Sequence, residues 1–399
     1  MTRVEATGPG AESTERDLAL SLVRDDVPFR LLRRVGLVPS SGLGVGRRAV
    51  FFALLAWLPI AIWAVAAGRA LPGGTTEPLL EHFGVHVRCL LAIPLLIVAQ
   101  GMAHRTTTLL LPWFLRSGVI AADRAPQLRE VVRGAARLRN SVLPWIAIAG
   151  IAIAWSAVGP VAHDADEVSW AVTNAVPATG FGGWWFLYVA RPIYVILALA
   201  WIWRVILLTL IFRGATKVGL DLVPTHPDRV GGLGFVERFA TIFGPVAFVF
   251  SAVIASQWAH QGMFHDLAVG TLKAPAAAFL VVALIVFLAP LAVFAGPLSA
   301  ARKRAELEYG ALIGRHGAGV RRRWILGERI DDDLLSAPEI GPVADTAALY
   351  ESVTRMRPLP IGKRALIAIA LPALVPILLV FAIKVPLAQI LGKLLKGLV

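Results

Sequence analysis

Seven separate runs of apolar residues, each close to the length that crosses a lipid bilayer, constrain this chain more than any other feature. A membrane-spanning helix needs about 20 mostly apolar residues. Hydropathy predicts spans at about 50–68, 87–104, 142–161, 184–212, 239–258, 275–298 and 365–383. Hydrophobic residues make up 57% of the chain and charged residues only 16%, whereas soluble domains average about 45–50% and about 25%. The sequence therefore predicts an all-α, polytopic transmembrane helical bundle.

The predicted spans divide the chain into four regions. Because the first 49 residues hold no apolar stretch of signal-peptide length, we expect the first span to direct insertion. We expect a cytoplasmic N-terminal segment with an interfacial helix at 1–49, a six-span core at 50–298, a cytoplasmic loop at 299–364, and a seventh span with an amphipathic tail at 365–399. Pro372 and Pro376 interrupt the last apolar run, so a half-crossing hairpin is the alternative to a complete seventh span.

The basic residues lie almost entirely in alternate connections. Eight, seven, four and twelve of the 39 lysines and arginines fall in 1–49, 105–141, 213–238 and 299–364, and only five fall in the opposite connections and the tail. Since positively charged loops stay on the cytoplasmic side, we expect the N-terminus to be cytoplasmic. The 31 basic and 20 acidic residues of that face give it a net charge of +11. Such a face attracts anionic lipid, so its basic character requires no nucleic-acid partner.

Three arginines fall inside predicted spans: Arg88, Arg191 and Arg204. All 26 carboxylates lie outside the spans, so we expect the three to have no acidic partner at membrane depth. Charged residues inside spans are costly and commonly mark a substrate or ion pathway. Proton and cation relays normally use intramembrane carboxylates, so this pattern favours an anion as the ligand, or no transport at all. The alternative is that the side chains reach lipid headgroups.

Arg191 is the strongest of the three candidates, because Pro192 follows it and leaves backbone groups that need a hydrated or protein-lined environment. Pairing of Arg191 with an outer-loop carboxylate, Asp164 or Asp166, remains an alternative. Arg204 lies thirteen residues further along the same span, about 220° around an α-helix. One straight helix therefore cannot direct Arg191 and Arg204 at the same point.

A loop of unusual composition, PTHPDRVGGLGF at 224–235, precedes the fifth span. Its candidate ligand-binding residues are His226, Asp228, Arg229, Gly231, Gly232 and Gly234. The glycines allow positive φ, so their amides could point at an anion together with the nearby helix N-terminus. The alternative is a tight turn in which Asp228 accepts hydrogen bonds from loop amides and His226 is hydrogen-bonded.

The remaining chemistry-bearing residues predict no cofactor, metal or catalytic set. Cys89 is the only cysteine and lies within an apolar run, which excludes an intrachain disulfide. The loop offers a metal only His226 and Asp228, too few ligands for a site. Four histidines outside the spans have no ligand-like spacing: His82, His86, His260 and His265. The chain has no GxSxG, HExxH or P-loop pattern.

Three stretches resemble an uncharacterised family of bacterial multi-pass integral membrane proteins. They are DLVPTHPDRVGGLGF around the loop, LLSAPEIGPVADTAALYESVTRMRPLPI at 334–361, and ILGKLLKGLV at the end of the chain. The pattern HPD-x-x-GGLGF is the most specific of them, and the similarity covers most of the chain after residue 180. The resemblance implies a location in the bacterial cytoplasmic (inner) membrane and implies no activity.

The sequence leaves three functions open. The first is a channel or transporter for an anion, with Arg88 and Arg191 in the outer half and Arg204 below them. The second is a membrane scaffold or sensor whose basic cytoplasmic face binds lipid or a protein partner. The third and weakest is a membrane-embedded enzyme that acts on a lipid or phosphate through the loop residues His226, Asp228 and Arg229. A homo-oligomer, with seven spans as one subunit of a ring, is compatible with each of them.

Overall fold

The computed structural model describes residues 17–40, 42–72, 78–162, 166–172, 179–264, 269–328 and 340–384. Over these ranges the chain is helical, and its only β pairing is an isolated bridge between Val172 and Thr179. Seven helical stretches in the same ranges are long and apolar enough to cross a membrane. The predicted class, a polytopic helical membrane protein, is confirmed.

Each apolar stretch overlaps one predicted span. Their bounds are Val45–Ala66, Phe83–Arg116, Ala122–Ser156, Phe181–Val218, Leu233–Phe264, Gly270–Ala292 and Lys363–Ala382. Their α-helices are α3 (Val45–Ala66), α4 (Phe83–His86), α5 (Ile93–Leu110), α6 (Trp113–Arg116), α7 (Ala125–Asn140), α8 (Leu143–Ala162), α9 (Phe181–Trp185), α10 (Arg191–Val218), α11 (Gly244–Phe264), α12 (Lys273–Ala292) and α15 (Lys363–Lys384). Three more helices lie outside them: α2 (Val27–Arg34), α13 (Ala295–Val320) and α14 (Ile340–Thr354).

Short 3₁₀- and π-helical segments connect or extend these helices. The 3₁₀ segments are Leu79–Glu81, Ala122–Arg124, Asp166–Ala171, Leu233–Phe243 and Val269–Leu272, and the π segments are Val87–Ala92, Phe186–Ala190 and Arg321–Ile325. Two of the π segments join short helices to long ones, α4 to α5 and α9 to α10, so that each pair forms one continuous rod.

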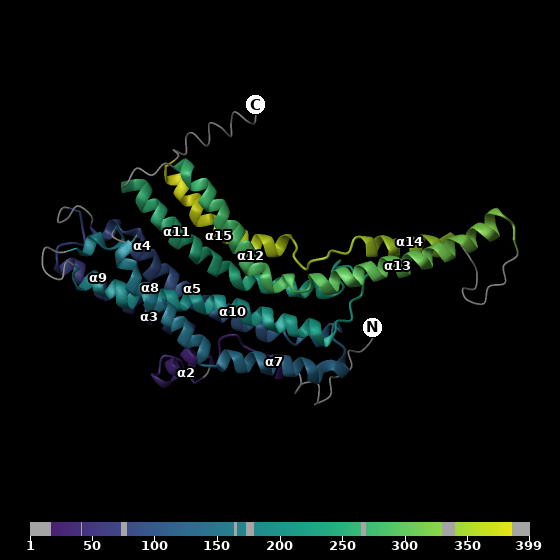
Figure 1. Cartoon of the computed structure of the whole chain (residues 1–399), viewed down its shortest axis with the longest axis horizontal. Coiled ribbons are helices and arrows are strands. Elements are labelled where there is room, and N and C mark those ends of the chain that lie inside the picture. Colours follow the sequence, from purple (N-terminus) through teal and green to yellow (C-terminus); the bar gives the residue numbers. More distant parts are fainter. Residues whose placement is uncertain are drawn as a thin grey trace, which may run out of the picture.

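The last apolar run forms a complete helix. α15 continues over 22 residues through both of its prolines and packs along α11 (Figure 1). Ser251 Oγ donates a hydrogen bond of 2.5 Å to the Ala373 carbonyl, which joins the two helices at mid-length. A half-crossing hairpin therefore does not form within Lys363–Lys384. The predicted amphipathic tail, 386–399, lies outside the described residues.

The sixth span ends earlier than hydropathy predicts. α12 ends at Ala292 and α13 begins at Ala295, within the predicted range 275–298. Hydropathy does not detect the break, because Phe294 within it and Leu298 after it are apolar residues that are fully buried in the core. α13 then leaves the bundle and forms a projecting hairpin with α14 (Figure 1). Within the loop region 299–364, Arg302 Nη1 of α13 donates to the Met356 carbonyl at 3.1 Å, next to α14.

Aromatic side chains fill the main core between the long helices. The largest fully buried rings of this cluster are Trp201, Phe114, Phe212, Phe239, Phe243, Phe287 and Phe294. Trp201 Nε1 donates to the Leu96 carbonyl at 3.1 Å, so the one polar atom of this ring is satisfied inside the bundle. Trp201 belongs to α10, which is thereby held against α5 at the centre of the bundle (Figure 1).

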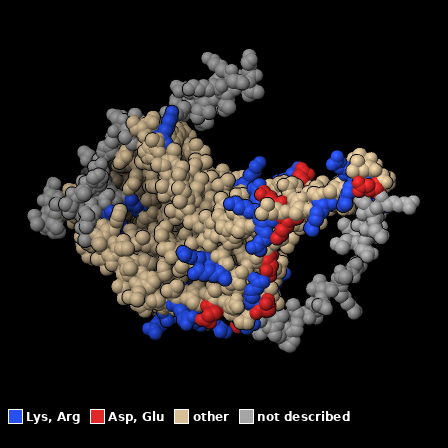
Figure 2. Space-filling model, turned by 45° about the vertical axis from the view of Figure 1, so that its right-hand side comes forward, with Lys and Arg blue, Asp and Glu red and all other residues tan. Residues whose placement is uncertain are grey.

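Charged side chains gather at one end of the bundle, here called the charged end. It carries α2, α7 and the α13–α14 hairpin, whereas the surface over the spans in this view is almost uncharged (Figures 1 and 2). On α7, Arg137 pairs with Glu130 at 2.6 Å, and both side chains are exposed. The charged end corresponds to the connections that the sequence predicts to be cytoplasmic, and that orientation stays a prediction.

Candidate functional site

Two of the three span arginines line one cavity between the helices, here called the Arg88–Arg191 pocket. The cavity has a volume of about 410 Å³ and is also lined by Trp155, Tyr194 and Gln257. The Arg88 and Arg191 side chains come from different spans and are buried, with 8% and 6% of their surface exposed. Two guanidinium groups, an amide and aromatic walls are suited to an anion that also carries apolar groups.

Both arginines of this pocket occur at π-helical segments. Arg88 lies within Val87–Ala92, and Arg191 directly follows Phe186–Ala190. In each case a proline, Pro94 or Pro192, stands two residues beyond the segment. A proline lacks the N–H of a regular helical turn and clashes with the carbonyl four residues earlier, and a widened turn relieves that clash. Such π-bulges are frequent at functional sites.

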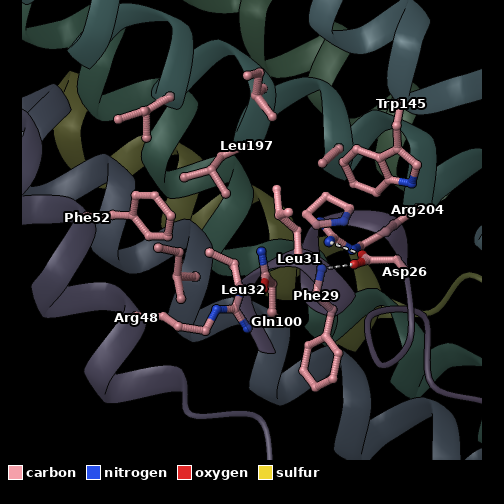
Figure 3. A pocket seen from close by; sticks show the side chains of 15 residues that line it. Asp26, Phe29, Leu31, Leu32, Arg48, Phe52, Gln100, Trp145, Leu197 and Arg204 are labelled. Carbon is pink, nitrogen blue, oxygen red and sulfur yellow. Dashed lines mark hydrogen bonds and ion pairs between the residues drawn. The ribbon is translucent and has the colours of Figure 1, made fainter. Parts of the chain in front are cut away.

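Arg204 lines a different cavity of about 220 Å³ at the inner side of the charged end, here called the Arg204 pocket (Figure 3). Its Nη2 lies 3.4 Å from Asp26 Oδ2, and the two side chains are 3% and 4% exposed. The expectation that Arg204 has no acidic partner at this depth is therefore wrong. The N-terminal segment folds back onto the spans and buries Asp26, a contact between positions 178 residues apart.

Local interactions of α2 place Asp26 there. Asp26 is the N-cap of α2 and its Oδ1 accepts a hydrogen bond of 2.8 Å from the Phe29 amide. Pro28 stands in the first turn of α2, where its missing N–H is tolerated. The Phe29 ring, 3% exposed, anchors the helix to Val38 and Leu43. The helix expected within 1–49 thus forms at Val27–Arg34 and makes one wall of the Arg204 pocket, and its place at the membrane surface stays a prediction.

A second arginine of the Arg204 pocket was not predicted from the sequence. Arg48, at the start of α3, is 4% exposed and its Nη2 donates to Gln100 Oε1 at 2.5 Å (Figure 3). In the sequence, Arg48 is grouped with the exposed basic residues of 1–49. Only the fold places it in the Arg204 pocket. The sequence signal for such a residue was Gln100, which lies inside an apolar run. A buried amide requires a hydrogen-bonding partner, so Gln100 indicated that a polar side chain lies beside it.

The charge balance of the Arg204 pocket is positive. Burial raises the pKa of the Asp26 carboxyl, and the opposing effects of Arg204, the Phe29 amide, Arg48 and Arg139 do not reverse that shift. A carboxyl whose ionised form is disfavoured compensates two guanidinium groups only in part. The pocket therefore has excess positive charge within apolar walls.

The loop at 224–235 is a tight turn organised by Asp228. Its carboxylate accepts hydrogen bonds from the amides of Val230 at 2.9 Å, Gly232 at 3.2 Å and Gly234 at 2.8 Å. His226 Nδ1 lies 2.9 Å from Asp228 Oδ1. Partial burial opposes ionisation, but these hydrogen bonds together hold the pKa of Asp228 below its ordinary value. The anion hypothesis predicts that the amides of Gly232 and Gly234 point at a ligand. In the structure they donate to the Asp228 carboxylate instead.

The same loop is fixed to the segment before α15. Arg229 and Gly231 have positive φ angles of 60° and 66°, which turn the chain sharply. The Arg357 amide donates to the Arg229 carbonyl at 2.7 Å, and Ser352 Oγ donates to the Thr225 carbonyl at 3.4 Å. Two of the segments that carry the family resemblance therefore lie in contact.

A cavity of about 470 Å³ beside the loop is lined by Asp228 and Gly234, and neither His226 nor Arg229 lines it.

The fold brings together two histidines that sequence spacing did not relate. The rings of His82 and His260 lie 4.7 Å apart at the end of the bundle opposite the charged end. His86 instead accepts a hydrogen bond from Trp57 Nε1 at 3.0 Å. Among the described residues, which exclude His265 and Asp164, no cluster of three or more His, Cys, Asp or Glu could hold a metal ion.

Comparison of the chain with protein-family models, with curated proteins and with solved structures found no match. The resemblance through HPD-x-x-GGLGF thus stays a prediction. The geometry of the described residues defines an integral membrane protein with two separate arginine pockets along α10.

Proposed function

We propose that the protein transports an organic anion across the bacterial cytoplasmic membrane and binds it in the Arg88–Arg191 pocket. The observation that carries this proposal is that two buried guanidinium groups from different spans line one cavity between membrane-crossing helices. Guanidinium groups pair with carboxylates and phosphates through two parallel hydrogen bonds. Trp155 and Tyr194 provide apolar surface for the rest of the ligand.

The separation of the two arginine pockets favours a transporter over an open channel. Arg191 and Arg204 lie about 20 Å apart along α10, at 1.5 Å per residue. The two pockets share no lining residue, although α8 and α10 contribute to both. Because the Arg88–Arg191 pocket does not continue into the Arg204 pocket, an anion that moves from it toward the charged end requires a change in the packing of α8 on α10, which is the behaviour of a carrier.

The experiment is uptake of radiolabelled benzoate, with chloride as a second probe, into proteoliposomes at an inside-positive potential. A charge-assisted hydrogen bond contributes about 1.5–3 kcal/mol, so Arg191→Gln is expected to lower benzoate uptake at least roughly tenfold. Arg213→Gln is the matched control, because Arg213 lies on the same helix, is exposed, and does not line the pocket. Equal benzoate uptake by the wild type, Arg191→Gln and empty liposomes would contradict the proposal.

A scaffold is the second candidate, and the projecting α13–α14 hairpin favours it. Leu307 on α13 is 77% exposed and Ile325 beyond its end is 74% exposed, away from the spans. A photo-crosslinking amino acid at position 307 is expected to capture one defined partner in native membranes if the hairpin binds a protein. The same group at Arg304, on a charged part of α13, serves as the control. Identical adducts from both positions would exclude a specific partner at Leu307.

A further inference from the structure

We infer that the Arg204 pocket binds the phosphate group of an anionic phospholipid, with the first part of an acyl chain against its apolar wall. This site is separate from the transport proposal, because the Arg204 pocket shares no residue with the Arg88–Arg191 pocket. The inference rests on unsatisfied donors, on the shape of the pocket and on its surroundings.

The first observation is a set of buried donors that lack acceptors. Within the described part of the chain, Nε and Nη1 of Arg204, Nε of Arg48 and Nε1 of Trp145 are buried without a hydrogen-bond partner. All three side chains line the Arg204 pocket (Figure 3). An unsatisfied buried donor destabilises a protein, and a charged one does so more strongly. The oxygens of a phosphate are strong acceptors for such groups.

The second observation is the shape and lining of the pocket. Its volume of about 220 Å³ is smaller than the roughly 300–1,000 Å³ of sites that enclose a whole drug-sized ligand. Phe52, Ile97 and Leu197, from three different spans, form its apolar wall. Leu31 also lines the pocket and is 60% exposed, so the pocket reaches the surface of the protein. A headgroup phosphate fits inside, and the acyl chains continue outside along the spans.

The third observation is the charge around the pocket. α2 forms one wall of the pocket and exposes Arg30, Arg33 and Arg34 beside it. Basic residues near a membrane surface attract anionic lipid. Inorganic phosphate offers the same oxygens as a lipid headgroup, but it leaves the apolar wall without a partner. The combination of buried guanidinium groups and apolar surface therefore favours the lipid.

The experiment is lipid retention measured by native mass spectrometry. The protein is placed in discs of phosphatidylcholine that contain a minority of phosphatidylglycerol, then released, and the retained lipids are identified. We expect wild type to retain phosphatidylglycerol in preference to phosphatidylcholine. Arg204→Gln is expected to lower that retention at least tenfold, whereas Arg213→Gln, on the exposed part of the same helix, leaves it unchanged.

Two further variants separate loss of binding from loss of folding. Leu197→Trp fills the pocket and keeps both arginines, and it is expected to lower phosphatidylglycerol retention as Arg204→Gln does. Asp26→Asn removes the carboxylate that competes for Arg204 and keeps a good helix N-cap, so it is expected to raise retention above that of wild type. A variant that was merely damaged would not retain more lipid.

Several results would overturn the inference. One is wild-type protein that retains phosphatidylglycerol no better than phosphatidylcholine, and another is unchanged retention in both Arg204→Gln and Leu197→Trp. If inorganic phosphate alone raises the thermal stability of wild type but not of Arg204→Gln, while no phosphatidylglycerol is retained, free phosphate is the ligand and the lipid assignment is wrong. Retention is measured without a gradient, so its failure is distinguishable from a failure of benzoate transport.

Discussion

At the scale of single residues, Asp26 has two structural roles that substitutions can separate. It caps α2 through the Phe29 amide, and it faces the buried guanidinium group of Arg204. Asp26→Ala removes both interactions and leaves a buried charge without its carboxylate, which typically costs about 3–5 kcal/mol. Asp26→Asn keeps the cap, so we expect a smaller loss of stability. Thermal unfolding in detergent, followed by circular dichroism, measures both, and equal unfolding temperatures for the two variants would contradict this account.

The ionisation of Asp228 makes the stability of one loop, 224–235, depend on pH. Its pKa in the folded protein is below the unfolded value of about 3.9. The carboxylate therefore stabilises the loop above the unfolded pKa, and this contribution is lost as pH falls through the folded pKa. We expect hydrogen exchange over 224–235, corrected for its intrinsic pH dependence, to accelerate in acid below pH of about 4. Asp228→Asn is expected to exchange faster at neutral pH and to show no such acceleration, and a parallel pH response in both proteins would refute the role of the carboxylate.

Residue types alone predicted part of the candidate site. Arg88, Arg191 and Arg204 stand out because guanidinium groups are rare inside apolar runs. The other charged residues of the Arg204 pocket could not be predicted, because Asp26 and Arg48 lie in a polar N-terminal region whose return to the spans leaves no periodic pattern. The composition of the loop at 224–235 is equally compatible with a tight turn and with an anion site. Only the distances from Asp228 to the loop amides distinguish a self-satisfied turn from an anion site.

At the scale of helices, hydropathy located all seven apolar stretches but not their irregular parts. A π segment and the break at Val293 change the backbone without lowering the apolar content of the sequence. Pro192 did indicate freed backbone groups near Arg191. Pro94 stands in the same relation to the π segment that contains Arg88, and it is the corresponding sequence signal for that segment.

The contact between α11 and α15 depends on one small residue. A Cβ atom on Gly244 would lie 2.5 Å from the Ala368 carbonyl oxygen, which is backbone and cannot rotate away. Gly244→Ala therefore forces the helices apart, and we expect a loss of about 1–3 kcal/mol, as for overpacked cores. Gly150→Ala in α8 is the matched control, since a Cβ there meets no atom within 4 Å. Thermal unfolding of both variants tests the prediction, which fails if Gly244→Ala unfolds no earlier than Gly150→Ala.

At the scale of the whole molecule, the distribution of basic residues predicts which end faces the cytoplasm. Cys89 is the only cysteine and is fully buried, so Cys89→Ala provides a background for single-cysteine labelling. Ser117→Cys lies at the charged end and Leu80→Cys at the opposite end, and both positions are exposed. With a membrane-impermeant maleimide on intact cells, we expect Leu80→Cys to react at once and Ser117→Cys only after permeabilisation. The reverse pattern would overturn the predicted orientation.

The contact between Asp26 and Arg204 also has a consequence for biosynthesis. The two residues are 178 positions apart, and ribosomes add roughly 5–20 residues per second. Asp26 is therefore incorporated roughly 10–35 s before Arg204. During this interval Phe29 can already anchor α2 to Val38 and Leu43, but Asp26 lacks Arg204, and three of the membrane-crossing helices are synthesised before that partner. The Arg204 pocket is thus completed only when the fourth membrane-crossing helix supplies Arg204 to Asp26 of α2.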